Sequence, residues 1–75
     1  MTADDLLEEA RRRVRQLILS GDNTIKNRDD DARLARARAR FEEARRIAAE
    51  AGLDDVLPII DVRLADLPGP EGDAS

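Results

Sequence analysis

Apolar residues recur at steps of three and four through most of this 75-residue chain, and this spacing constrains the fold more than any other feature. Such steps place side chains on one face of an α-helix, whereas a β-strand would show alternation. Three segments carry the pattern, so we predict helices over about residues 3–26, 31–51 and 55–67. Their inner stripes are Leu7, Ala10, Val14 and Leu17; Leu34, Ala37, Phe41, Ala44, Ala48 and Ala51; and Val56, Ile60, Leu64 and Leu67. The sequence therefore predicts an all-α domain of three antiparallel helices over residues 1–67.

The ends of these helices have recognisable capping residues. Thr2, followed by acidic residues, suits the N-cap of the first helix. Asp29–Asp31 offer N-caps for the second helix, and Asp54 or Asp55 offers one for the third. Gly52 suits a left-handed C-terminal cap of the second helix. Residues 68–75 contain only Pro, Gly, Ala and polar residues, so we expect a disordered tail there.

Two interpretations of Gly21 remain open: the end of the first helix, or a small residue buried within it. Helix propensity favours an end at Ser20, since Gly costs about 1 kcal/mol relative to Ala inside a helix. Continuing the stripe from Leu17 by fours gives Gly21 and Ile25, which favours a helix to about Lys26. We favour continuation, because the burial pattern usually overrides weak local preference.

A small residue inside the first helix combines with a small–large–small pattern in the second. The residues that form this combination are Leu17, Gly21, Ala37, Phe41 and Ala44. Over residues 17–51 the combination resembles a tetratricopeptide repeat, with the third helix following as a cap. The segment between the helices is longer than the tight turn of that family, and Thr24 stands where an aromatic residue is usual. The resemblance implies a scaffold that binds peptides or protein partners and performs no chemistry.

The side chains that most enzymes rely on are missing. The chain has no His, Cys, Tyr or Trp, so the usual general base at neutral pH and the best nucleophile are absent. The oxygen-rich segment over residues 22–31 lacks the central Gly and the final Glu of an EF-hand loop. Helix capping explains its aspartates more simply. We therefore expect a protein that is not an enzyme and that binds no metal or cofactor.

A row of arginines on the second helix offers one candidate binding surface. Twelve of the 13 basic residues are arginine, a bias typical of a GC-rich, bacterial genome. The row consists of Arg33, Arg36, Arg38 and Arg40. It could hold an anionic ligand or a nucleic acid. The net charge of −4 and the lack of aromatic residues for base stacking favour an ordinary solvated helix face instead.

Three large apolar residues, Leu19, Ile59 and Val62, lie off the inner stripes and offer a second candidate surface. Exposed apolar patches often mark protein contacts, and small domains commonly gain stability by association. These residues could also line the edges of an ordinary core. The function that we predict is a small non-catalytic protein–protein interaction module. Its partner is either a second copy, through a two-fold contact of the first and third helices, or another protein. No apolar run approaches the roughly 18 residues of a membrane span, and no secretion signal is evident, so we expect a cytoplasmic protein.

Overall fold

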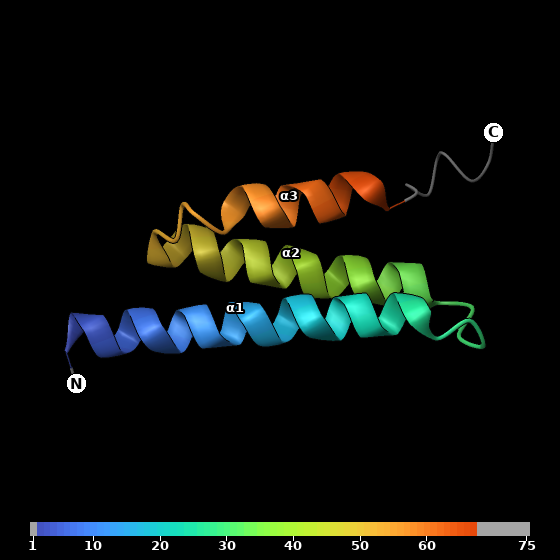
Figure 1. The fold of residues 1–75 in the computed structure, drawn as a ribbon, viewed down its shortest axis with the longest axis horizontal. Helices are drawn as coiled ribbons and strands as arrows, with labels where there is room; N and C mark the ends of the chain where they lie inside the picture. The colour runs from blue at the N-terminus through green and yellow to red at the C-terminus, as the bar shows by residue number, and fades with distance from the viewer. Residues whose placement is uncertain (1, 68–75) are drawn as a thin grey trace.

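The computed structural model describes residues 2–67, and these residues form three helices joined by two short turns (Figure 1). Helix α1 spans Ala3–Lys26, α2 spans Arg33–Ala51 and α3 spans Leu57–Asp66. In Figure 1, α2 lies between the other two and runs antiparallel to each, so α1 and α3 point the same way. The predicted all-α class and number of helices are thereby confirmed for the described part of the chain. The predicted tail, residues 68–75, lies outside it.

Helix α1 has the bounds that the sequence predicted, and it passes through Gly21. At its start, the backbone N–H of Asp5 donates to Thr2 Oγ1 at 3.2 Å, and the N–H of Thr2 donates to the Asp5 carboxylate at 3.3 Å. This reciprocal capping box satisfies two backbone donors that the helix itself leaves unpaired. Gly21 is buried, and a Cβ atom placed there would lie 2.5 Å from Cε1 of Phe41. Gly21 is therefore a point of close packing within the helix.

The second helix begins within two residues of its predicted start, but its predicted N-cap was wrong. Helix α2 begins at Arg33, and its N-cap is Ala32, which makes no side-chain cap hydrogen bond. The carboxylate of Asp30 instead accepts from the N–H of Ala32 at 2.9 Å. This local turn satisfies one donor just ahead of the helix, so the aspartates shape the connection and do not cap the helix.

The third helix also begins within two residues of its predicted start, and its predicted N-cap was also wrong. Helix α3 begins at Leu57, with Val56 as an N-cap that makes no side-chain hydrogen bond, and it ends at Asp66. Neither Asp54 nor Asp55 caps it, because the turn before it returns Leu53 to the core and directs Asp55 toward α1. Pro58 stands in the first turn of α3, where its missing N–H leaves no bond unmade.

The end of α2 confirms the prediction for Gly52. This residue has φ of 73°, in the left-handed region, and the N–H of Leu53 donates to the carbonyl of Ala48 at 2.8 Å. Leu53 then enters the core, where it is 3% exposed. The cap therefore ends α2 and fixes the direction of the chain toward α3.

The core is small and has one aromatic side chain at its centre. Phe41, Val14 and Ile60 are the largest fully buried side chains in the described region. The rest of the core comprises Leu17, Ala37, Ala44, Ala48, Leu53 and Leu67. Three of the α2 positions in the core are alanine, which lets α1 and α3 approach α2 closely. With so little interior, several large apolar side chains remain outside it.

Candidate interaction surface

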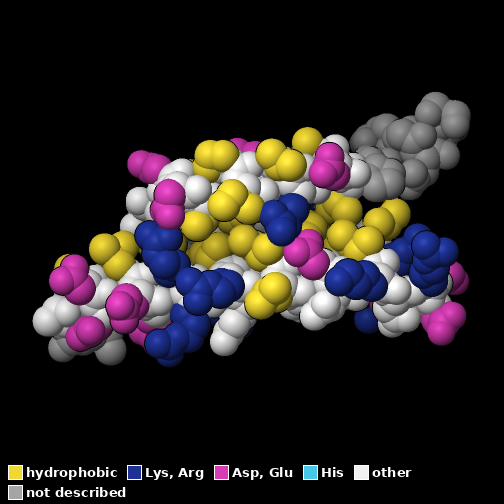
Figure 2. Space-filling model, viewed as in Figure 1, with side chains coloured by type: hydrophobic (Ala, Val, Ile, Leu, Met, Phe, Trp, Pro, Cys, Tyr) yellow, Lys and Arg dark blue, Asp and Glu magenta, His cyan; other side chains and the backbone are white. Residues whose placement is uncertain are grey.

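An apolar hollow lies between α1 and α3. Figure 2 shows hydrophobic side chains gathered there, crossed by basic and acidic side chains. The hollow has a volume of about 220 Å³. Its apolar lining comprises Val14, Ile18 and Leu19 of α1, Val56 at the N-cap of α3, and Ile59 of α3. Its charged rim comprises Arg11, Arg15, Asp22 and Arg63. We call this surface the α1/α3 groove.

All three apolar residues that the sequence singled out are exposed. Leu19 is 56% exposed, Ile59 47% and Val62 60%. Leu19 and Ile59 both line the α1/α3 groove, although they belong to different helices. Val62 lies one turn beyond Ile59 on α3 and does not line it. The structure therefore brings two of the three residues together on one surface.

Two ion pairs at the rim of the groove link α1 to α3 and to the turn that precedes it. Nη1 of Arg11 lies 2.7 Å from the Asp55 carboxylate. Arg63 donates through both Nε and Nη2 to Asp22, at 3.2 Å each. The hydrogen bond from Arg11 lowers the pKa of Asp55 below its ordinary value, and the same bond raises the pKa of Arg11. These pairs link the two sides of the groove across the face of α2.

Arg15 differs from the other two arginines at the rim. Its side chain is exposed and forms no ion pair or hydrogen bond with any residue in the 2–67 range that the structure describes. A guanidinium without a partner beside an apolar hollow can bind a carboxylate without first breaking another contact. The groove thus offers an apolar floor and one available positive charge.

Leu7 was predicted to point inward, and this prediction was wrong. Leu7 is 41% exposed and its neighbour Leu6 is 54% exposed. Helix α1 has 24 residues against 19 in α2 and 10 in α3, and its N-terminal turns extend beyond both (Figure 1). The apolar stripe continues into these turns, but neither α2 nor α3 covers it there. The difference in predicted helix lengths was the signal that could have revealed this.

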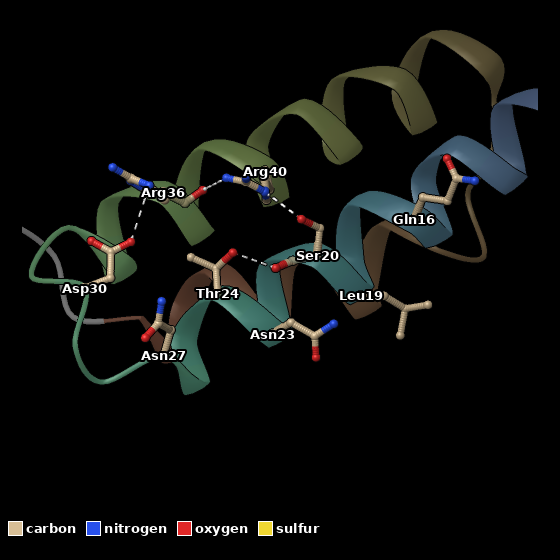
Figure 3. A pocket seen from close by; sticks show the side chains of 9 residues that line it. All are labelled: Gln16, Leu19, Ser20, Asn23, Thr24, Asn27, Asp30, Arg36 and Arg40. Carbon is tan, nitrogen blue, oxygen red and sulfur yellow. Dashed lines mark hydrogen bonds and ion pairs between the residues drawn. The ribbon is translucent and has the colours of Figure 1, made fainter.

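The predicted arginine row is divided between two sides of α2. Figure 3 shows Arg36 and Arg40 at a polar hollow between α1 and α2. Nε of Arg40 donates to Ser20 Oγ at 2.6 Å, and Arg36 lies 3.4 Å from the Asp30 carboxylate. Arg38, in contrast, donates to the carbonyl of Leu67 at 3.4 Å, near the end of α3. These arginines therefore do not form one open surface.

Arg33 is the fourth member of the row. It is partly buried, and its Nε has no hydrogen-bond partner. It lies on the same stripe of α2 as Arg36 and Arg40 but does not line their hollow. A ligand at that hollow would therefore meet two arginines, both of which already have partners.

Two further features bear on the class of site. No group of three or more acidic, His or Cys side chains within residues 2–67 is arranged to hold a metal ion. In the same region, none of the helices has the length and apolar character needed to cross a membrane.

No family model, curated protein or solved structure matches this chain. Its function is therefore inferred from the geometry of its own surfaces.

Proposed function

We propose that this protein is a small non-catalytic interaction module that binds a protein partner in the α1/α3 groove. The observation that carries the proposal is the exposure of Leu19 and Ile59 at the edges of one apolar hollow. Large apolar side chains from different elements that meet on a surface are typical of a binding site. The resemblance of residues 17–51 to a tetratricopeptide repeat implies the same class of function.

The energetics of the groove agree with this function. Complete burial of a Leu or Ile side chain contributes about 1.5–3 kcal/mol. Leu19 and Ile59 are roughly half buried already, so each can contribute about 1 kcal/mol more when a partner covers it. The free guanidinium of Arg15 adds a preference for a partner that carries a carboxylate beside its apolar side chain. The groove suits an amphipathic helix with acidic flanks.

Site-specific photo-crosslinking tests the proposal. With p-benzoylphenylalanine at position 59, we expect discrete covalent adducts in cells that make the protein. The matched control places the same group at position 49, which is exposed on α2 and does not line the groove. Equal labelling from both positions, or none from position 59, would contradict the proposal.

The alternative function, anion or nucleic-acid binding by the arginine row, has weaker support. Arg36 and Arg40 would have to give up their contacts with Asp30 and Ser20 before they could bind a phosphate group. If this alternative holds, the protein binds RNA or DNA at low salt and loses that binding steeply as salt rises. Absence of binding at low salt would exclude it.

A further inference from the structure

The N-terminal turns of α1 form an overhang that neither α2 nor α3 covers. The start of α1 extends beyond the ends of α2 and α3 (Figure 1), and every side chain from residue 3 to residue 9 is exposed. Leu6 and Leu7 lie in this segment at 54% and 41% exposure. We call residues 3–9 the α1 overhang. Two neighbouring leucines on an uncovered helix end indicate a surface that a partner covers.

One row of residues on α1 runs from the overhang into the groove. Arg11, Arg15 and Asp22 line the groove, and steps of three and four toward the N-terminus lead from Arg11 to Glu8 and Asp4. The charged part of this row is therefore acidic in the overhang and basic where the groove begins. Leu7 stands four residues before Arg11 and shares this side of the helix.

Such a row is self-complementary in one orientation only. When two copies of α1 run antiparallel, the acidic overhang of each lies along the part of the groove that holds Arg15 of the other. When they run parallel, acidic residues meet acidic residues and basic residues meet basic ones, which is unfavourable. The charge pattern therefore selects an antiparallel second copy as the occupant.

We propose that two copies of this chain form a two-fold dimer in which the α1 overhang of each copy lies in the α1/α3 groove of the other. The proposal rests on the proposed function, since it names the partner of the same groove. Leu7 enters the hollow between Val14 and Ile18 on one side and Ile59 on the other. The hollow of about 220 Å³ is large enough for it, because an apolar cavity of roughly 150 Å³ already accommodates benzene.

The charges around Leu7 fit the same arrangement. Glu8 is next to Leu7, so the insertion of Leu7 brings the Glu8 carboxylate to Arg15 of the partner subunit, and Asp4 lies one turn farther along the groove. Arg15 is the rim arginine without an intrachain partner among the described residues. The two-fold axis crosses α1 near Arg11, where two like charges approach. Each Arg11 is already paired with Asp55 at 2.7 Å, which reduces their repulsion.

Sedimentation equilibrium of purified protein over a wide concentration range is the first test. We expect the mass to approach twice 8.3 kDa as concentration rises. Arg15→Glu should raise the dimer dissociation constant by about tenfold or more, since two symmetric contacts change from attraction to repulsion. Arg13→Glu is the matched control: it makes the same change of charge at an exposed α1 position that does not line the groove, so it should leave the constant almost unchanged.

A mixing experiment identifies the contact. The double variant Asp4→Arg with Glu8→Arg should also dissociate, because its overhang then repels Arg15. Mixed with Arg15→Glu, it should form a heterodimer, since each overhang then meets a groove of opposite charge. Circular dichroism of each variant confirms that the three helices are retained.

The outcomes separate this inference from the proposed function. A monomer at every concentration overturns the dimer, and so does a dimer that Arg15→Glu and Arg13→Glu weaken equally. Failure of the mixed variants to associate overturns the proposed contact. Adducts from position 59 to a different protein, with a monomer in solution, would overturn the dimer while supporting the interaction module. A lack of adducts from position 59 would overturn the proposed function itself.

Discussion

Replacing Gly21 by Ala is expected to destabilise the fold, although the same change at an open helix position stabilises. A Cβ atom on Gly21 would lie 2.5 Å from Cε1, 2.8 Å from Cζ and 3.0 Å from Cδ1 of the Phe41 ring. Carbon atoms pack best at about 3.5–4.0 Å, so the ring or α1 would have to move by about 1 Å. Phe41 is completely buried, and its ring cannot turn away without displacing other core side chains.

The magnitude follows from two opposing effects. Overpacking a core costs about 1–3 kcal/mol. Alanine in place of glycine within a helix contributes about 1 kcal/mol in favour of folding. Because three atoms of one rigid ring are involved, the cost of overpacking should lie in the upper part of its range. The free energy of unfolding should then fall by about 1–2 kcal/mol in total. In a domain of this size, such a loss lowers Tm by roughly 4–16 °C.

Urea and thermal unfolding followed by circular dichroism measure this loss, since the chain has no Trp or Tyr for fluorescence. Asn23→Ala is the control, because Asn23 is exposed on the same helix and should gain a few tenths of a kcal/mol. In a Phe41→Leu background, Gly21→Ala should become neutral or stabilising, because the smaller side chain can move away. A stabilising effect of Gly21→Ala in the wild-type chain would refute the close packing described here.

Three further predictions concern the helix ends and one ion pair. Gly52→Ala should cost about 1 kcal/mol of unfolding free energy through backbone strain alone, since φ is 73° and nothing lies within 4 Å of the new Cβ. Thr2→Ala should cost about 1 kcal/mol through loss of the capping box; urea unfolding checks both values, and no loss would contradict them. Arg11 lowers the pKa of Asp55 in the folded state, so their pair stabilises the fold above the ordinary carboxyl pKa of about 3.9. That contribution should vanish as pH falls through the lowered value. The stability difference between wild type and Asp55→Asn, measured by urea unfolding across the acid range, should then shrink, and a difference that persists at the lowest pH would contradict the assignment.

The helices could be predicted because the spacing of apolar residues reflects which face of each helix is buried. Ile25 continues the apolar stripe beyond Gly21. Burial of that stripe outweighs the low helix propensity of the residues between Gly21 and Ile25. The wrong N-cap predictions have a different cause. An aspartate near a helix start can cap it, form a turn or pair with a distant arginine, and local sequence does not decide among these. Asp55 pairs with Arg11, 44 residues away, which only the packing of α3 beside α1 makes possible.

The surface was predictable in part for the same reason. Leu19, Ile59 and Val62 lie off the stripes, so their exposure followed from helix geometry alone. Leu19 and Ile59 share a groove because of the way α3 is offset along α1. The spacing of apolar residues within each helix does not predict this offset. The exposure of Leu7 depends in turn on where α2 ends relative to α1.

Unequal helix lengths account for both the overhang and the groove. Helix α3 has only 10 residues and α2 has 19, so together they cover α1 incompletely. One consequence is an N-terminal end of α1 with Leu6 and Leu7 exposed, and another is an open hollow beside Leu19 and Ile59. A foreign helix bound in the groove would cover the hollow but leave those two leucines in solvent. A second copy that contributes its own overhang covers the hollow and shields Leu7 in the same contact, which is why the dimer accounts for more of the exposed apolar surface than any partner bound to the groove alone.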